Sequence, residues 1–471
     1  MTNKFETPLS VRYASKYMLN LFSLDTRFIT WRKLWVALAK AEKTLGLNIT
    51  QEQIDQLEAN IYNLNYDVIN QREKEVKHDV MAHIYGYGKL APQAEAIIHL
   101  GATSCYVTDN ADLIIYRDAL LHIKTQLEKL ISSLIDFANV NKDVPTLGYT
   151  HYQPAQLVTV GKRATLWIQD LMSDYQEIQH VIENIKFLGC RGTTGTEASF
   201  MKLFDDDSSK IDQMNQLIAK EFNFDQLFDV CGQTYPRKLD SLILNVLSSI
   251  GQTLHKMATD VRLLQHDYQI EEPFAENQIG SSAMAYKKNP IRCERICSLA
   301  RYLISNVYNS AFTSSTQWFE RTLDDSANRR IVLPESFLCA DSILLIAQNV
   351  FSGLKVNKKI IEKAVLDYLP YIATENILME AVKKGGNRQI VHGEIRRISL
   401  LAKEKNINGE EFNMIDEMKK SSIINLSDEE LNNIFDPNKY IGRCVEQVTN
   451  YLEKVKSKIN YTSSNSSEFI I

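Results

Sequence analysis

The segment from Gly280 to Pro290 has the composition of an anion-binding loop. It reads Gly-Ser-Ser-Ala-Met-Ala-Tyr-Lys-Lys-Asn-Pro and leads from a Gly/Ser stretch into a predicted helix start. Backbone N–H groups and the dipole at a helix N-terminus attract anions. A mobile linker with solvated lysines would have the same composition, so both interpretations stay open. Four cationic side chains would strengthen the attraction for an anion: Lys287, Lys288, Arg292 and Arg295.

A second polar connection, residues 146–155, carries His151 just before a long predicted helix. A free imidazole titrates near neutral pH, so His151 could donate or accept a proton in a reaction. A single loop histidine is more often structural or simply solvated, and the residues alone leave that alternative open.

Two neighbouring segments combine hydroxyls with charge. His99, Thr103 and Ser104 precede a predicted helix start, and Lys77-His78-Asp79 falls within a predicted short helix over residues 76–85. Adjacent residues on a helix point in different directions, so we expect only part of this trio to face one ligand. Ordinary surface charge is the alternative.

Residues 318–330 are dense in groups that bind carboxylate or phosphate. The stretch Trp-Phe-Glu-Arg-Thr-Leu-Asp-Asp-Ser-Ala-Asn-Arg-Arg contains three arginines, which suit bidentate contacts to such anions. A solvated charge cluster needs no partner and is an equal alternative.

Several classes of function are disfavoured. The segments 192–196 and 232–235 match neither a phosphate-binding P-loop nor a dinucleotide fingerprint, and the nine histidines form no recognisable metal motif. We therefore predict no metal and no cofactor. The net charge of -5 lacks the basic excess that favours nucleic acid as a partner.

These loops must be positioned by helices. Glycine (18) and proline (10) are scarce in 471 residues, and apolar residues recur at the helical period over long stretches. The sequence predicts an all-α bundle, because long amphipathic helices need one another to bury their apolar faces. The five predicted long helices cover residues 109–138 (capped by Asp109), 158–185, 239–264, 290–311 and 331–354.

Shorter helical segments are expected on both sides of this centre, at 30–45, 51–57 and 76–85 and again after residue 357. We predict three domains: residues 1–110, a central bundle at 111–356 with the 280–290 loop, and 357–471, broken at Gly385-Gly386. The Ser/Asn-rich tail at 460–467 is expected to be frayed.

The cysteines and the N-terminus indicate the compartment. Seven cysteines without a C-x-x-C pair favour a reducing environment. Neither a signal peptide nor an uninterrupted membrane-spanning apolar stretch is recognisable, so we expect a cytoplasmic protein without a membrane partner.

The loop at 280–290 resembles the signature of the fumarase/aspartase superfamily, G-S-S-x-M-P-x-K-x-N. Companion stretches at 99–104, 148–155, 192–199 and 319–330 are similar to one branch of that superfamily, the adenylosuccinate lyases. Fumarases and aspartases lack the Arg-Thr-Leu-Asp-Asp-Ser run that begins at Arg321. The resemblance extends from Arg12 to about Asn387.

The resemblance implies a three-domain helical subunit whose five long helices join those of three other subunits in a 20-helix core of a homotetramer, with active sites shared between subunits. It also implies β-elimination of fumarate from adenylosuccinate, which gives AMP, and from succinylaminoimidazole-carboxamide ribotide, which gives the carboxamide ribotide. Both reactions belong to purine nucleotide biosynthesis and break a C–N bond.

The resemblance further implies roles for individual residues. Ser281 is the expected general base and His151 the general acid, with His78 supporting the acid or a phosphate. Removal of a proton beside a carboxylate creates a dianion, which Lys287 and the helix start at Asn289 would stabilise. Thr103, Ser104, Gln233 and Arg295 should hold the succinyl group, and Arg12, Tyr13, Arg321, Ser326 and Arg330 the nucleotide. Lys77, Asp79, His99 and Glu294 also match site positions of the family.

One position departs from the signature, because Ala285 stands where the family has proline. We expect the loss of the fixed proline φ to favour an open loop and to raise KM or slow closure. Three rival functions compete with this one: a sister lyase acting on argininosuccinate, fumarate or aspartate; a silent scaffold; and a Ser/His hydrolase. The scaffold should lack Ser281 or His151, and the hydrolase needs a G-x-S-x-G elbow, which Gly280-Ser-Ser does not form.

Overall fold

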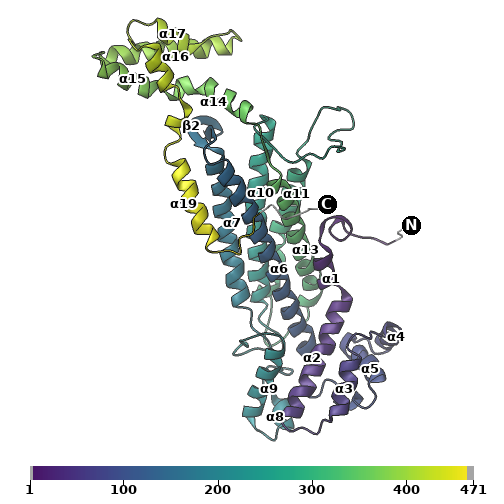
Figure 1. Cartoon of the computed structure of the whole chain (residues 1–471). Helices are drawn as coiled ribbons and strands as arrows, with labels where there is room; N and C mark the ends of the chain where they lie inside the picture. Colours follow the sequence, from purple (N-terminus) through teal and green to yellow (C-terminus); the bar gives the residue numbers. More distant parts are fainter. Residues whose placement is uncertain (1–3, 464–471) are drawn as a thin grey trace. The chain divides into compact units, whose positions relative to one another are not determined.

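The computed structural model describes residues 4–463, and it is built almost entirely of helices (Figure 1). Strands are limited in this part of the chain to two short two-stranded sheets. The predicted all-α class is therefore confirmed.

The N-terminal region consists of short and medium helices. Side-chain oxygens of Ser15, Ser23 and Thr50 accept backbone N–H groups and so fix the starts of the first three α-helices. The elements are a π-helical turn at Leu9–Tyr13, α1 (Lys16–Leu21), α2 (Leu24–Thr44), α3 (Gln51–Ala59), α4 (Tyr66–Val76), α5 (Asp79–Leu90) and a 3-10 turn at Glu95–Ile97.

The five long helices occur close to where the apolar period predicts them. They are α6 (Ser104–Val140), α7 (Val160–Glu183), α10 (Lys238–His266), α11 (Ile291–Ser305) and α13 (Asp325–Ser352).

Three of their predicted ends are wrong. Helix α6 begins at Ser104, so Asp109 is not its N-cap but a buried residue inside the helix. Helix α13 begins at Asp325 and not near residue 331. The helix expected to run to about residue 311 ends at Ser305, and α12 (Val307–Ser315) follows as a separate element. The exact ends of helices depend on contacts with residues elsewhere in the chain, and the spacing of apolar residues contains no information about those contacts.

The remaining helices are short. Two lie between the long helices, α8 (Ala198–Leu203) and α9 (Ser208–Glu221). The C-terminal region contains α14 (Lys358–Ile372), α15 (Thr374–Lys383), α16 (Arg388–Ile407), α17 (Met414–Lys420), α18 (Asp428–Ile434), a 3-10 turn at Pro437–Tyr440 and α19 (Cys444–Lys456). The expected break at Gly385-Gly386 separates α15 from α16.

A β-hairpin occupies the connection that carries His151. Strands β1 (Pro145–Thr150) and β2 (Gln153–Thr159) pair antiparallel, with an irregular register at Gly148. A Cβ at Gly148 would lie 2.6 Å from the carbonyl oxygen of Gln156, so only glycine fits this close approach. Strands β3 (Ile270–Glu271) and β4 (Lys355–Val356) form the second pair.

The chain forms two compact units, each assembled from three stretches of sequence. The first contains the residues up to 127, 173–256 and 295–347, and the second contains 128–172, 257–294 and the residues from 348 onward. This grouping follows spatial proximity, and the three-domain division of the sequence stays a prediction.

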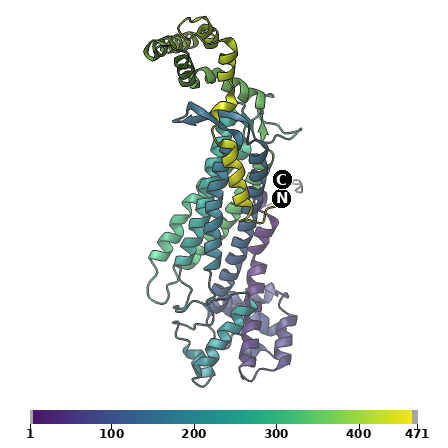
Figure 2. The same cartoon turned by 60° about the vertical axis from the view of Figure 1, so that its left-hand side comes forward.

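Within the first unit, parts of the long helices lie side by side (Figures 1 and 2). Their apolar faces form a core with fully buried Leu120, Ile296 and Leu344. Polar side chains join neighbouring helices: Ser249 donates to Asp174 at 2.6 Å, Cys339 to the Leu299 carbonyl at 3.3 Å, and His122 pairs with Asp341 at 3.0 Å.

The second unit has its own hydrophobic core. Leu147 and Leu157 of the hairpin pack in one cluster with Ile361 and Leu369 of α14 and with Ile398 of α16. The hairpin therefore rests on the C-terminal helices of this unit.

Helix α13 is apolar enough, by length and composition, to cross a membrane. Its most apolar window is 78% buried inside the protein, as expected of a core helix.

The predicted tail at 460–467 is only partly described. Asn460 and Tyr461 are hydrogen-bonded to Glu128 and Asp136, so the expectation of fraying is wrong at these positions. Residues 464–467 lie outside the described residues.

Candidate active site

A cavity of about 1160 Å³ in the first unit gathers many of the predicted site residues. Cationic groups and hydroxyls dominate those residues, which is a composition suited to a ligand with several anionic groups. The predicted residues that line it are Lys77, His78, Asp79, Thr103, Ser104, Gln233, Arg321, Ser326 and Arg330.

The trio at 77–79 does not lie on a single helix. Lys77 has a left-handed backbone, with φ of 54°, and ends α4, whereas His78 is the N-cap of α5. All three side chains line the cavity. The predicted helix over residues 76–85 is therefore wrong at its start, because the chain turns at Lys77 and α5 begins at Asp79.

His78 presents one nitrogen to its own helix and the other to Ser104. Nδ1 accepts the backbone N–H of Met81 at 3.3 Å, so in the neutral imidazole Nε2 carries the proton. Nε2 lies 3.4 Å from the Ser104 Oγ, at the start of α6. The cap interaction thus selects the tautomer that can donate a hydrogen bond from Nε2.

The Gln233 side chain is oriented by two contacts. The thiol of Cys105 donates to its Oε1 at 3.4 Å, and its Nε2 donates to the Thr193 carbonyl at 3.0 Å. Burial raises the pKa of Cys105 to about 12, so the thiol keeps the proton that it donates. Gln233 therefore has a defined amide orientation at the cavity wall.

Two cavity arginines are held by carboxylates. Arg321 donates from Nη1 to both oxygens of Asp325, at 3.2 and 3.1 Å. Arg330 reaches Asp79 at 3.4 Å, which connects α13 to the first residue of α5. These bonds limit the rotamers of both guanidinium groups before any ligand binds.

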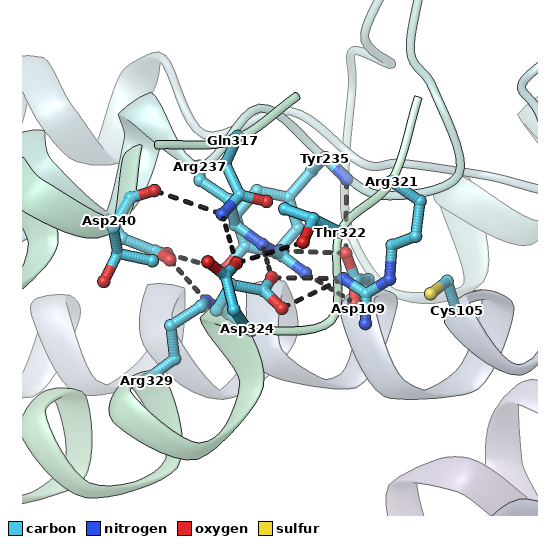
Figure 3. A network of polar contacts seen from close by, with 12 residues as sticks. Cys105, Asp109, Tyr235, Arg237, Asp240, Gln317, Arg321, Thr322, Asp324 and Arg329 are labelled. Carbon is cyan, nitrogen blue, oxygen red and sulfur yellow. Dashed lines mark hydrogen bonds and ion pairs between the residues drawn. The ribbon is translucent and has the colours of Figure 1, made fainter. Parts of the chain in front are cut away.

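The sequence reasoning missed a buried charge network behind this wall (Figure 3). Arg237 donates to Asp109 at 2.9 Å and to Asp325 at 2.6 Å. Arg329 bonds Asp240, with the Tyr235 hydroxyl as a further partner. The available signal was the presence of charged residues within otherwise apolar helical stretches, which indicates buried pairing.

The network keeps its arginines charged although they are buried. Burial is the largest single effect and lowers the pKa of Arg237, but Asp109, Tyr235 and Asp240 together raise it, and the net shift is upward. Burial likewise lowers the pKa of Arg329, Asp240 raises it, and the net shift is again upward. Burial also raises the pKa of the Asp112 carboxyl, against a lowering by Arg329.

Three predicted nucleotide and succinyl residues meet elsewhere in the first unit. The guanidinium carbons of Arg12 and Arg295 lie 5.8 and 5.2 Å from the centre of the Tyr13 ring. His99, in contrast, is mostly buried, and its Nδ1 accepts the indole N–H of Trp35 at 2.9 Å. Burial, followed by the charge of His78, lowers the pKa of His99 to about 4, so this imidazole is neutral.

The second unit carries His151 at the tip of the β1–β2 hairpin. His151 and Tyr152 form its two-residue turn, with φ of 51° and 58°. Turns with two left-handed residues usually contain Asn or Gly, so these two side chains impose local strain. The turn leaves the imidazole exposed at the end of a hydrogen-bonded ladder.

Ser281 lies in a loop closed at its base, also in the second unit. Its Oγ accepts the backbone N–H groups of Ala283 at 3.3 Å and Met284 at 3.1 Å. Asn289 donates its side-chain amide to the Gly280 carbonyl at 2.8 Å. Two N–H donors directed at one hydroxyl oxygen favour a negative charge there.

The helix that follows the loop does not offer its N-terminus to an external anion. Helix α11 starts at Ile291, and buried Glu272 accepts the N–H groups of Arg292 at 3.1 Å and Cys293 at 2.9 Å. The expectation of a free, anion-binding helix start is therefore wrong, because a carboxylate from the same unit already occupies it. Lys287 and Glu294 are exposed.

Comparison with known proteins identifies the family. A model described as Lyase matches residues 10–304, and one described as Adenylosuccinate lyase C-terminus matches residues 370–451. The chain is 49% identical to an adenylosuccinate lyase of Schizosaccharomyces pombe, over 96% of this chain and 94% of that protein. The enzyme of Saccharomyces cerevisiae is 48% identical, over 96% and 95%. The chain belongs to the adenylosuccinate lyase family.

A solved structure shares the fold of this adenylosuccinate lyase family member. The 3-carboxy-cis,cis-muconate lactonizing enzyme of Pseudomonas putida superimposes with a TM-score of 0.82, at 21% identity, over 95% of this chain and 99% of that one. The resemblance to adenylosuccinate lyases within the fumarase/aspartase superfamily is thereby confirmed, and it extends beyond residue 387 into the C-terminal helices. Across residues 4–463, His, Cys, Asp and Glu form no cluster suited to a metal ion.

Proposed function

We propose that the chain is a C–N lyase that removes fumarate from adenylosuccinate, giving AMP, and from succinylaminoimidazole-carboxamide ribotide, giving the carboxamide ribotide. The observation that carries this proposal is the near-complete coverage by adenylosuccinate lyases at 48–49% identity. The cavity supports it independently, because both substrates combine a phosphate with carboxylates and the lining offers matching cations and hydroxyls.

The predicted binding residues carry the charges and hydroxyls that the phosphate and the carboxylates of the substrate need. Arg321, Ser326 and Arg330 in the cavity, with Arg12 and Tyr13, would bind the nucleotide and its phosphate. Thr103, Ser104, Gln233 and Arg295 would hold the succinyl carboxylates. Arginine forks and hydroxyls bind both kinds of anion through charge-assisted hydrogen bonds.

The chemical step needs a base, an acid and a cation. Ser281 would take the proton beside the carboxylate, and the Ala283 and Met284 N–H groups favour its alkoxide form. Lys287 would stabilise the resulting dianion, and His151 would protonate the departing amine. His78 would donate from Nε2 to the phosphate or to a group near His151.

Assembly and location are part of the proposal. We propose a cytoplasmic homotetramer in which the long helices of four copies pack together and each active site draws residues from three of them. Exposed apolar side chains on the long helices, including Leu121, Leu242 and Ile331, support such packing.

A continuous absorbance assay with purified adenylosuccinate tests the reaction. We expect turnover by the wild type and losses of at least about a hundredfold in kcat for Ser281→Ala and for His151→Ala. Ser282→Ala is the matched control and should keep its activity. An inactive wild type would favour a sister substrate, tested with argininosuccinate, fumarate and aspartate, or a silent scaffold. Full activity of Ser281→Ala would show that the base is a different group.

A further inference from the structure

Asp325 is the carboxylate that holds Arg321 in place. It is fully buried in the first turn of α13 and accepts Nη1 of Arg321 at 3.1 Å and Nε of Arg237 at 2.6 Å. The Arg321 side chain retains 22% exposure and lines the cavity. One buried acid therefore restrains an arginine that remains open to a ligand.

Asp325 is restrained in turn by the rest of the network. Arg237 forms an ion pair with Asp109 of α6, and the backbone N–H of Tyr235 donates to the same carboxylate at 3.2 Å. Figure 3 shows how Asp109, Arg237 and Arg321 lie within this set of contacts. The chain Asp109–Arg237–Asp325–Arg321 thus links α6 to the loop before α13.

The same elements carry both predicted ends of the substrate site. Helix α6 begins with Ser104, and the segment before Arg237 contains Gln233, both expected at the succinyl group. The backbone N–H of Gln233 also donates to the Glu320 carbonyl, one residue before Arg321, at 3.0 Å. A shift at Asp325 would therefore move the predicted phosphate ligand relative to the succinyl ligands.

Stability alone does not explain this arrangement. Burying the three charges of Asp109, Arg237 and Asp325 carries a desolvation penalty, and well-packed apolar residues are often at least as stabilising as a buried ion-pair network. The Asp325 carboxylate, which lies between two arginines, instead fixes the position of the exposed arginine, Arg321. Within residues 4–463, the Arg321 Nε and Nη2 donate to no other protein group, so their donors remain available to a ligand in the cavity.

We propose that Asp325 is a positioning residue that sets the Arg321 guanidinium for the substrate phosphate, with Arg237 and Asp109 as its support. The proposal rests on the proposed function, because it takes Arg321 as a substrate ligand. Arg321 binds the phosphate equally before and during the elimination, so loss of its position should weaken substrate binding and leave the chemical step intact.

Steady-state kinetics of Asp325→Asn test the proposal. The substitution keeps the side-chain size and removes the charge that holds both arginines. We expect KM for adenylosuccinate to rise about tenfold or more while kcat stays within about twofold. Asp324→Asn is the matched control, because Asp324 is exposed and contacts Thr322 and Gln317 instead. It should leave KM unchanged.

A double-mutant cycle separates positioning from folding. In an Arg321→Gln background, Asp325→Asn should change KM by less than about twofold, because the residue through which it acts is gone. Additive effects on KM, or a loss of thermal stability with unchanged KM in the folded enzyme, would overturn the proposal.

A milder variant covers the case in which Asp325→Asn does not fold. Arg237→Lys keeps the charge but loses the Nε contact to Asp325, so it should raise KM severalfold, again without additivity to Arg321→Gln. An unchanged KM in folded Arg237→Lys would contradict the proposal.

Calorimetric titration with AMP provides a readout that needs no turnover. A wild type that neither turns over adenylosuccinate nor binds AMP contradicts the proposed function, whereas an active wild type with unaffected variants contradicts this inference alone.

Discussion

His78 accepts the backbone N–H of Met81 through Nδ1, at 3.3 Å, and in this way caps helix α5 with a side chain that also lines the cavity. One imidazole therefore has a structural and a proposed functional role, divided between its two nitrogens. The division can be tested because asparagine is a good N-cap without the second nitrogen.

Substituting His78 should separate these two roles. We expect His78→Asn and His78→Ala both to reduce kcat about a hundredfold, since both lack Nε2. Only His78→Ala should also lower the free energy of unfolding, by about 1 kcal/mol, because it removes the cap. Thermal unfolding and steady-state kinetics of both variants give the comparison. An active His78→Asn would assign His78 a capping role only.

Removing the Cys105 thiol should affect substrate binding through Gln233. In Cys105→Ala the Gln233 Oε1 loses its donor, the amide can rotate, and KM for adenylosuccinate should rise severalfold with little change in kcat. Cys339→Ala is the control, since that thiol donates to a helix carbonyl instead and its loss should leave KM unaffected. Equal effects of the two substitutions on KM would argue against an oriented Gln233.

Restoring the family proline at position 285 should favour the closed loop and lower KM. The Lys287 N–H donates to the Met284 carbonyl at 3.0 Å, which places Ala285 at the second position of a β-turn, where proline is favoured. We expect Ala285→Pro to lower KM by roughly twofold to fivefold, which corresponds to about 0.4–1 kcal/mol of conformational entropy. Stopped-flow and steady-state kinetics measure the change, and unchanged or worse kinetics would refute the expectation.

Ala283→Pro is the opposite control in the same loop. Proline there removes the N–H that donates to the Ser281 Oγ at 3.3 Å. We therefore expect kcat to fall in this variant, whereas Ala285→Pro keeps both donors to Ser281.

Glu42 should make stability depend on pH. This carboxyl is fully buried, and burial raises its pKa to about 8 in the folded protein from a usual value of 4.5. The folded state keeps the proton where the unfolded state has released it, so stability falls as pH rises from about 4.5 to 8. Between pH 6 and 9 we expect a loss of about 3 kcal/mol.

Denaturant unfolding at the two pH values, in the wild type and in Glu42→Gln, measures this effect. The amide cannot ionise, so the variant should lose most of the pH dependence. Glu58→Gln is the control and should keep it, because Glu58 lies at the surface and pairs with Lys40. The same slope in the wild type and in Glu42→Gln would show that Glu42 does not hold its proton.

Local signals in the sequence were sufficient for the cores of the long helices and for part of the cavity lining. Apolar residues at steps of three and four placed the cores of α7 and α10 within a few residues of their observed ends. The motifs at 77–79, 103–104 and 321–330 supplied some of the polar residues that line the cavity. Such signals depend only on neighbours along the chain.

Two of the errors share one cause, which is a partner distant in sequence. Asp109 has the residue type of an N-cap, but Arg237 lies 128 positions away and draws its carboxylate into the core. The start of α11 has the composition of an anion site, but Glu272 caps it from 20 residues earlier. The error at Lys77 is different, because this residue has the propensity of a helix interior, yet its left-handed backbone ends α4 there.

The sequence by itself determined the family, the helical class and the identity of the side chains able to do the chemistry, because motifs and apolar periods are local properties. Only the tertiary structure decided which charges are paired, which nitrogen of His78 lies beside Ser104 and which arginine stays open to a ligand. Those outcomes depend on contacts between residues far apart in the sequence, such as Arg237 and Asp109 at a separation of 128, where burial makes the pairing compulsory.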